Sequence, residues 1–193
     1  MKTSVLISGM GGQGVVSIAM LLTECAAKTG FATCLPEHGP EQRGGYSRCT
    51  IVISDEELLS PMPKKYNYII AMDDLSAKKF APQLAPGGLM VLNAGLIAPT
   101  PGENKLFVPA ESIAAELGSP RSFNVILLGA LVGASGIVPL ALVEEALMEK
   151  FGDGVNLEAF RRGVDVCQRR ADGAPYQDCA RGAGIESPLA KHS

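Results

Sequence analysis

The residues best suited to chemistry stand near the start of the sequence, where four glycines fall within six positions: Gly9, Gly11, Gly12 and Gly14. The apolar stretch Thr3–Ser8 before them predicts a short strand, and apolar residues recur after them at helical spacing as far as Gly30. Glycines in such a turn can take positive φ and leave the backbone bare. Another group can therefore approach the N–H groups at the start of the helix.

The first, second and last of these glycines match the dinucleotide fingerprint G-x-G-x-x-G in the right strand–turn–helix setting. Such a fold needs an acidic residue about 20 positions further on, at the tip of the second strand. The predicted second strand, Phe31–Leu35, is followed by Pro36, and Glu37 comes only after it, in a new loop. This disfavours a nicotinamide or flavin site without excluding it. The glycines could also serve only a tight turn that packs helix on sheet.

A second glycine-rich loop, Glu37–Ser47, contains Arg43 next to Gly44 and Gly45. Because these glycines have no side chains, they do not restrict access to the Arg43 guanidinium. A guanidinium in that setting suits a phosphate, a carboxylate or an acidic group of a partner. By spacing alone, a solvated arginine in a surface turn is the plainer interpretation. In a doubly wound fold the carboxyl ends of parallel strands share one rim, so this loop and the glycine turn are expected at the same edge.

Several short motifs occur together along the chain: GMGGQGVV at 9–16, GPEQRGG at 39–45, ISDEELLSP at 53–61, AMDD at 71–74, PGG at 86–88 and a further one at 156–163. In this order and spacing, from about Ser4 to Arg162, the sequence resembles the gamma subunit of 2-oxoacid:ferredoxin oxidoreductases, most nearly the 2-oxoglutarate type. The tail beyond Arg170 has no counterpart in the resemblance.

The resemblance implies a subunit that is not active alone. The family decarboxylates a 2-oxoacid oxidatively, here expected to be 2-oxoglutarate, forms an acyl-CoA and carbon dioxide, and reduces ferredoxin. Thiamine diphosphate, magnesium and iron–sulfur clusters are expected on alpha, beta and possibly delta partners, with CoA as co-substrate. No catalytic residue is assigned to this chain. The residues expected to face the substrate, CoA or a partner are Gly9, Gly11, Gly12, Gln13, Gly14, Glu41, Arg43, Gly44 and Gly45.

The composition gives no support for nucleic-acid-binding, metal-binding or membrane proteins. A net charge of −3 and the absence of Trp give no reason to expect nucleic acid. The five cysteines contain no C-x-x-C pair, which predicts reduced thiols in a cytoplasmic protein and no iron–sulfur cluster on this chain. No metal site is predicted, since His38 and His192 lack ligand-like neighbours. No signal peptide is recognisable, and the longest apolar run, Val125–Ala134, is about half of what a bilayer requires.

The elements that must position these loops alternate along the chain. Strands are predicted at 3–8, 31–35, 48–54, 68–72, 89–93 and 105–108, with a helix at 75–84 capped by Asp73 or Asp74. This predicts an α/β, Rossmann-like fold with a mainly parallel sheet flanked by helices. The last third is predicted to be helical, and a single domain is expected over residues 1–171, with a flexible tail over 172–193.

Two features of the helical third matter for function. The helix Phe123–Ala134 is apolar all round, so it is buried either within its own domain or beneath a partner. Gly152-Asp153-Gly154 matches the opening of a thiamine-diphosphate motif, but no asparagine follows Asn156, which itself is expected to cap the last helix. The GDG stretch is therefore interpreted as a helix end and turn. The open alternatives are a stand-alone dinucleotide-binding oxidoreductase and a purely structural assembly module.

Overall fold

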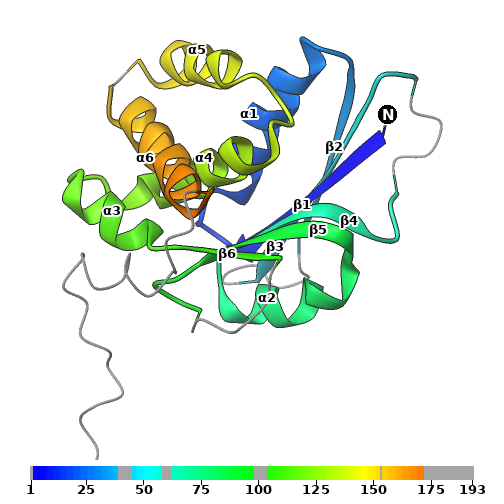
Figure 1. The fold of residues 1–193 in the computed structure, drawn as a ribbon, viewed down its shortest axis with the longest axis horizontal. Helices are drawn as coiled ribbons and strands as arrows, with labels where there is room; N and C mark the ends of the chain where they lie inside the picture. The colour runs from blue at the N-terminus through cyan, green and yellow to red at the C-terminus, as the bar shows by residue number, and fades with distance from the viewer. Residues whose placement is uncertain (1, 39–44, 58–61, 98–103, 153, 172–193) are drawn as a thin grey trace, which may run out of the picture.

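The computed structural model describes residues 2–38, 45–57, 62–97, 104–152 and 154–171 (Figure 1). Six strands form one sheet in the order β2-β3-β1-β4-β5-β6. Their bounds are β1 Lys2–Met10, β2 Phe31–His38, β3 Tyr46–Ser54, β4 Tyr66–Ala71, β5 Leu84–Asn93 and β6 Lys105–Val108. Five strands point the same way and β3 opposes them, because it pairs antiparallel with both β1 and β2. The prediction of an α/β fold with a mainly parallel sheet is confirmed.

The β2–β3 hairpin departs from the doubly wound expectation, in which β2 would lie beside β1. Instead β3 lies between them, and the whole pair is longer than predicted. Pro36 and Glu37 belong to β2 rather than to the loop, with Pro36 opposite Cys49. An edge strand such as β2 tolerates a proline, since the missing N–H can face away from the single partner strand. Because β2 still runs in the direction of β1, the loop after it returns to the rim where β1 ends.

Helices cover the two faces of the sheet unequally (Figure 1). One face carries α1 Val15–Ala27, α4 Phe123–Ser135, α5 Leu140–Phe151 and α6 Gly154–Ala171, with α3 Ala110–Glu116 beside them. The other carries the short helix α2 Asp74–Phe80. Successive strand residues alternate between two cores, so Val5 and Ile7 face α1 while Leu6 packs with Phe80 of α2. The short helix α3 is not among the predicted elements.

The predicted helix at 75–84 is shorter in the structure and begins at Asp74, with Asp73 as its cap. It ends at Phe80 because a 3-10 turn, Ala81–Gln83, follows and contains Pro82, which cannot continue the α-helical hydrogen bonding. The chain then enters β5 at Leu84, five residues before the predicted strand start at Leu89.

The apolar helix is α4, and it is buried within this chain. All nine residues from Asn124 to Val132 are buried. Helix α6 crosses it at glycines: a Cβ on Gly129 would lie 2.1 Å from the carbonyl oxygen of Phe160, and a Cβ on Gly163 would lie 2.0 Å from that of Ile126. The question left open by the sequence is therefore settled in favour of internal burial.

Two further expectations concern the last helices. Gly152 ends α5 with φ of 63°, as the interpretation of GDG as a helix end requires; Asp153 lies outside the described residues. Helix α6 begins at Gly154, so Asn156 lies in its first turn. The prediction that Asn156 caps this helix is therefore wrong. There its Oδ1 accepts a hydrogen bond from Ser122 Oγ at 3.1 Å. Residues 172–193 of the expected tail also lie outside the described part of the chain.

Candidate functional site

The glycine turn closes on itself directly after β1. The N–H of Gln13 donates to the carbonyl oxygen of Met10 at 3.2 Å, and the N–H of Met10 donates to Oε1 of Gln13 at 2.6 Å. The positive φ expected of the turn is found at Gly12 (90°) and Gly14 (77°). Gly11 and Gly12 are exposed, and a Cβ on Gly12 would meet no atom within 4 Å. This part of the turn presents bare backbone to solvent.

The other two glycines serve packing. A Cβ on Gly9 would lie 2.5 Å from Oε1 of Gln13 and 3.0 Å from Cβ of Met72. A Cβ on Gly14 would lie 2.1 Å from Nδ2 of Asn124, the second residue of α4. The glycines therefore divide into two pairs. Gly9 and Gly14 leave room for neighbouring side chains, whereas the exposed Gly11 and Gly12 leave room for an external group.

The geometry of this turn argues against a dinucleotide site. In that fold the acidic residue that holds the ribose stands on the strand beside β1. Here β3 occupies that place, and the tip of β2 is two strand spacings away, roughly 9–10 Å. Glu37 near that tip accepts a hydrogen bond from Nη2 of Arg48 instead.

The second loop meets the glycine turn at the rim, as predicted. The N–H of Gly11 donates to the carbonyl oxygen of Gly45 at 2.9 Å, and a Cβ on Gly11 would approach that oxygen to 3.3 Å. Glu41, Arg43 and Gly44, the other predicted residues of this loop, lie outside the described residues.

A buried polar network lies beneath the rim. Oγ of Ser8, at the end of β1, is 3.0 Å from Oγ of Ser76 in α2, and it also contacts the carbonyl oxygen of Ser47 at 3.4 Å. Asp73 accepts from the N–H of Ser76 at 2.8 Å and from its hydroxyl at 3.1 Å. The capping role predicted for Asp73 is confirmed. The link from Ser76 to Ser8 was beyond sequence reasoning, because the two residues are 68 positions apart.

Two basic residues that sequence reasoning missed lie near the first residues of β3, the strand that follows Gly45. Nζ of Lys79 stands 3.9 Å from the ring centroid of Tyr46, the residue after Gly45. Arg48 packs against the ring of Phe80 at 5.8 Å, and its Nε is buried without a hydrogen-bond partner. Its hydrogen bond with Glu37 raises the pKa of Arg48. The aromatic residue placed directly after RGG is the one signal that could have pointed to this cluster.

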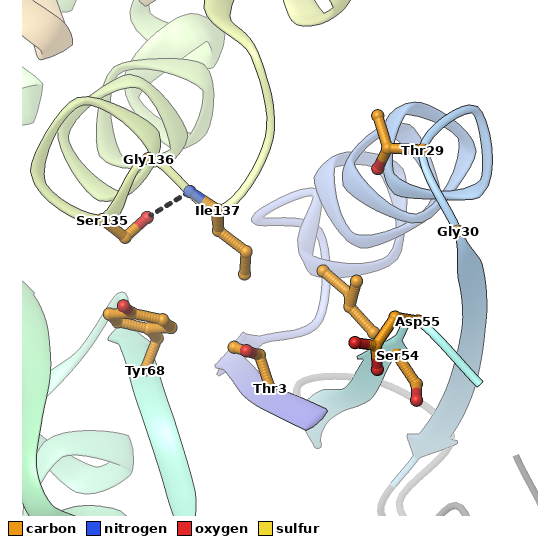
Figure 2. Close-up of a pocket in the computed structure, with 10 residues that line it drawn as sticks. Thr3, Thr29, Gly30, Ser54, Asp55, Tyr68, Ser135, Gly136 and Ile137 are labelled. Carbon is orange, nitrogen blue, oxygen red and sulfur yellow. Dashed lines mark hydrogen bonds between the residues drawn. The ribbon is translucent and has the colours of Figure 1, made fainter. Parts of the chain in front are cut away.

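A pocket lies where β1 begins and β3 ends, at the other end of these strands from the glycine turn. Figure 2 shows the residues that line it. Its volume is about 230 Å³, and its lining includes Thr3, Ser54, Tyr68 and Ser135. Part of its polar lining is already satisfied within the chain, since Ser135 Oγ donates to the carbonyl oxygen of Leu131 at 2.7 Å and accepts from the N–H of Ile137 at 3.3 Å. No predicted site residue lines this pocket.

The described residues contain neither a metal-binding cluster nor a membrane-spanning helix. No group of three or more His, Cys, Asp or Glu side chains among them is placed to hold a metal ion. None of the helices they form is both long enough and apolar enough to cross a membrane.

Residues 4–166 match the family model described as pyruvate ferredoxin/flavodoxin oxidoreductase. The chain belongs to this family. Among members, the 2-oxoglutarate synthase subunit KorC of Archaeoglobus fulgidus is 30% identical over 171 residues, covering 87% of this chain and 89% of KorC. The ketoisovalerate oxidoreductase subunit VorA of Methanothermobacter thermautotrophicus is 36% identical over 181 residues, and the chain spans only 38% of VorA. The indolepyruvate oxidoreductase subunit IorB of Pyrococcus horikoshii is 29% identical over 195 residues, covering 86% of this chain and 96% of IorB.

Solved structures share the fold. The gamma subunit of a keto/oxoacid ferredoxin oxidoreductase from Geobacter sulfurreducens superposes with a TM-score of 0.73 at 22% identity, covering 88% of this chain and 98% of that one. The 2-oxoglutarate:ferredoxin oxidoreductase from Magnetococcus marinus, solved with 2-oxoglutarate, coenzyme A and succinyl-CoA bound, gives 0.78 at 24% identity, covering 87% of this chain and 31% of that one. The resemblance found in the sequence motifs is thus confirmed at the level of family and fold.

Proposed function

We propose that this chain is the gamma subunit of a multi-subunit 2-oxoacid:ferredoxin oxidoreductase that acts on 2-oxoglutarate. The observation that carries the proposal is the match to KorC, which covers 89% of the Archaeoglobus subunit and 97% of the one from Methanothermobacter marburgensis. The match to VorA covers only 38% of that longer protein. IorB is covered as fully as KorC, to 96%, so coverage alone does not select the oxoacid. The choice of 2-oxoglutarate is supported by the KorC matches together with the motif order that resembles the 2-oxoglutarate type.

In this proposal the enzyme decarboxylates the oxoacid oxidatively, forms an acyl-CoA and passes electrons to ferredoxin, and the chain works only within the complex. Thiamine diphosphate, magnesium and iron–sulfur clusters belong to the alpha, beta and possibly delta partners. An iron–sulfur cluster of the common type needs four thiolates. No three His, Cys, Asp or Glu side chains gather to hold a metal among the described residues, and Cys34 and Cys49 form a pair without further thiolates grouped around them. The donor set in the described residues does not fit a cluster.

The part of this chain that would serve the reaction is the rim made by the glycine turn and the second loop. Gly11 and Gly12 are exposed there, and Gly11 is tied to Gly45. Bare backbone at the start of α1 lets a phosphate of CoA or a partner's acidic group approach closely. We assign Arg43, in the same loop as Gly45, the role of holding that anion. Lys79, over the ring of Tyr46, adds positive charge at the same place.

The alternatives explain less of the geometry. A stand-alone dinucleotide enzyme requires an acidic residue beside β1, where the structure has the antiparallel strand β3. A purely structural module accounts for Gly9 and Gly14, which pack against side chains, but gives no reason for the exposed Gly12. We also propose a cytoplasmic location, which the reduced thiols of Cys25, Cys34 and Cys49 favour.

The test is purification of the native complex through a tag on this chain, followed by assays with 2-oxoglutarate, pyruvate, 2-ketoisovalerate and indolepyruvate. We expect thiamine-containing partners to co-purify and CoA-dependent ferredoxin reduction to be fastest with 2-oxoglutarate. Activity with another oxoacid alone would reject the substrate assignment. Recovery of the chain without partners, or micromolar NAD binding by the chain alone, would reject the subunit assignment.

A further inference from the structure

Two cysteines that the proposed function does not use meet across the β2–β3 hairpin. Cys34 lies on β2 opposite Ile51, and Cys49 lies on β3 opposite Pro36, so the cysteines are diagonal neighbours on antiparallel strands. Both side chains belong to the face of the sheet that α1 covers. The side chains of such diagonal neighbours point to the same side of the sheet, and those of Cys34 and Cys49 lie within hydrogen-bonding reach of each other.

The two thiols differ in their surroundings. Cys49 is fully buried, whereas Cys34 is partly exposed. Their side chains share a hydrogen bond, which lowers the pKa of Cys34 to about 7 and raises that of Cys49. Thr23 can add a second hydrogen bond to Cys34, but its hydroxyl already donates to the carbonyl oxygen of Ala19 at 2.7 Å. Near neutral pH, Cys34 is therefore the nucleophilic member of the pair, with a second thiol in contact with it.

Cys25 provides the contrast within the same molecule. Its side chain is fully buried and donates to the carbonyl oxygen of Leu142 at 3.4 Å. Burial raises the pKa of its thiol, so it is held as an unreactive core residue.

We propose that Cys34 and Cys49 form a dithiol modification site that small-molecule disulfides convert into an intrachain disulfide. The Cys34 thiolate attacks the reagent RSSR, forms a mixed disulfide and releases RS⁻. The Cys49 thiol then loses its proton and attacks the Cys34 sulfur, expelling a second RS⁻. One disulfide is reduced to two thiols while two protein thiols are oxidised to one disulfide, so atoms and electrons balance.

The Cys34–Cys49 disulfide would link β2 to β3. These two strands flank the loop between His38 and Gly45. Cys49 is four residues from Gly45, which accepts the hydrogen bond from Gly11. Oxidation would therefore restrict the hairpin beneath the proposed CoA- or partner-binding loop. This last consequence rests on the proposed function, whereas the disulfide chemistry does not.

The experiment treats the full chain with oxidised glutathione near neutral pH, blocks free thiols and maps the cysteine peptides by mass spectrometry. We expect a Cys34–Cys49 linkage, with Cys25 still alkylated after unfolding. Cys34→Ser should abolish the linkage, Cys49→Ala should leave glutathione attached to Cys34, and Cys25→Ser should behave as the unchanged chain. The iodoacetamide reaction of Cys34 in Cys49→Ala should have a midpoint above about 7, because the hydrogen bond from Cys49 is lost.

The proposal is overturned if Cys34 and Cys49 both remain alkylatable after oxidation, or if the unchanged chain keeps glutathione on Cys34 without resolving it. Because the chain is tested without partner subunits, failure here leaves the subunit assignment intact. Failure to recover a native complex would, in turn, leave the disulfide result intact.

Discussion

The carboxamide of Asn124 occupies the space that a side chain at residue 14 would need: its Nδ2 lies 2.1 Å from the position of a Cβ on Gly14. The same nitrogen donates to the carbonyl oxygen of Gln13 at 3.1 Å. Residue 124 belongs to the buried helix α4, and residue 14 is the N-cap that precedes α1. The shape of the exposed turn is thus fixed from inside by α4, in which every residue from Asn124 to Val132 is buried.

Gly14→Ala should destabilise the chain more than Gly12→Ala. Both positions have positive φ, 77° and 90°, so each alanine costs about 1–2 kcal/mol of backbone strain. Only residue 14 adds a collision, with Asn124, worth roughly 1–3 kcal/mol more. Urea unfolding of the two variants measures the difference. Equal losses would show that Asn124 moves aside freely.

Gly163→Ala should be among the most damaging single changes, because its Cβ would lie 2.0 Å from the backbone oxygen of Ile126, and α4 and α6 would have to separate. We expect a loss of about 3 kcal/mol or more in the free energy of unfolding. Gly154→Ala is the matched control in the same helix, since its Cβ meets nothing within 4 Å. It should be neutral or raise stability by up to about 1 kcal/mol. A Gly163→Ala variant as stable as the control would contradict the close crossing.

Asp73→Ala should weaken the join between α2 and the end of β1. It removes the cap of α2 and the acceptor of the Ser76 hydroxyl, in a network that reaches Ser8. The expected cost is about 1–3 kcal/mol. Asp74→Ala, which removes an exposed ion pair with Lys78, should cost only about 0.5 kcal/mol. Thermal unfolding of both variants provides the comparison, and a larger loss for Asp74→Ala would refute the role given to Asp73.

The sequence predicts the local features of this fold well and the long-range ones poorly. The glycine turn, the cap at Asp73 and the apolar helix α4 each depend on residues close together in the chain. The position of β3 between β1 and β2 cannot be recognised in the local sequence. A strand alternates its side chains in the same way whether its partner is parallel or antiparallel. The predicted second strand also stops too early, before Pro36. A proline is tolerated there because β2 is an edge strand, and the sequence does not reveal that position.

The candidate site shows the same division. The meeting of Gly11 with Gly45 follows from the general rule that strand ends share a rim. The contact of Asn124 with residues 13 and 14 spans more than a hundred positions, and nothing in its local sequence marks it. The contact of Lys79 in α2 with Tyr46, the first residue of β3, joins elements that only the strand order brings together.

Arg43 gives a chemical test of the rim. If its guanidinium holds an anionic group of CoA or of a partner, Arg43→Lys keeps the positive charge but loses the bidentate hydrogen bonding of the guanidinium. It should then restore only part of what Arg43→Ala loses. A charge-assisted contact is worth about 1.5–3 kcal/mol, which is roughly a ten- to hundredfold change in KM for CoA or in subunit affinity. Full activity of Arg43→Ala in the complex would remove Arg43 from the site.

The most direct test of the central claim, that the rim of the glycine turn faces the catalytic partner, compares two exposed methionines. Met10, 49% exposed, stands at the rim, whereas Met148, 43% exposed, stands on α5 in the helix layer. In the reconstituted complex, Met10→Arg should weaken assembly or raise KM for CoA about tenfold or more, the change expected from losing one good contact. Thiamine content per catalytic partner should stay unchanged, and Met148→Arg should behave as the unchanged chain. A Met10→Arg complex that assembles and turns over normally would contradict the claim.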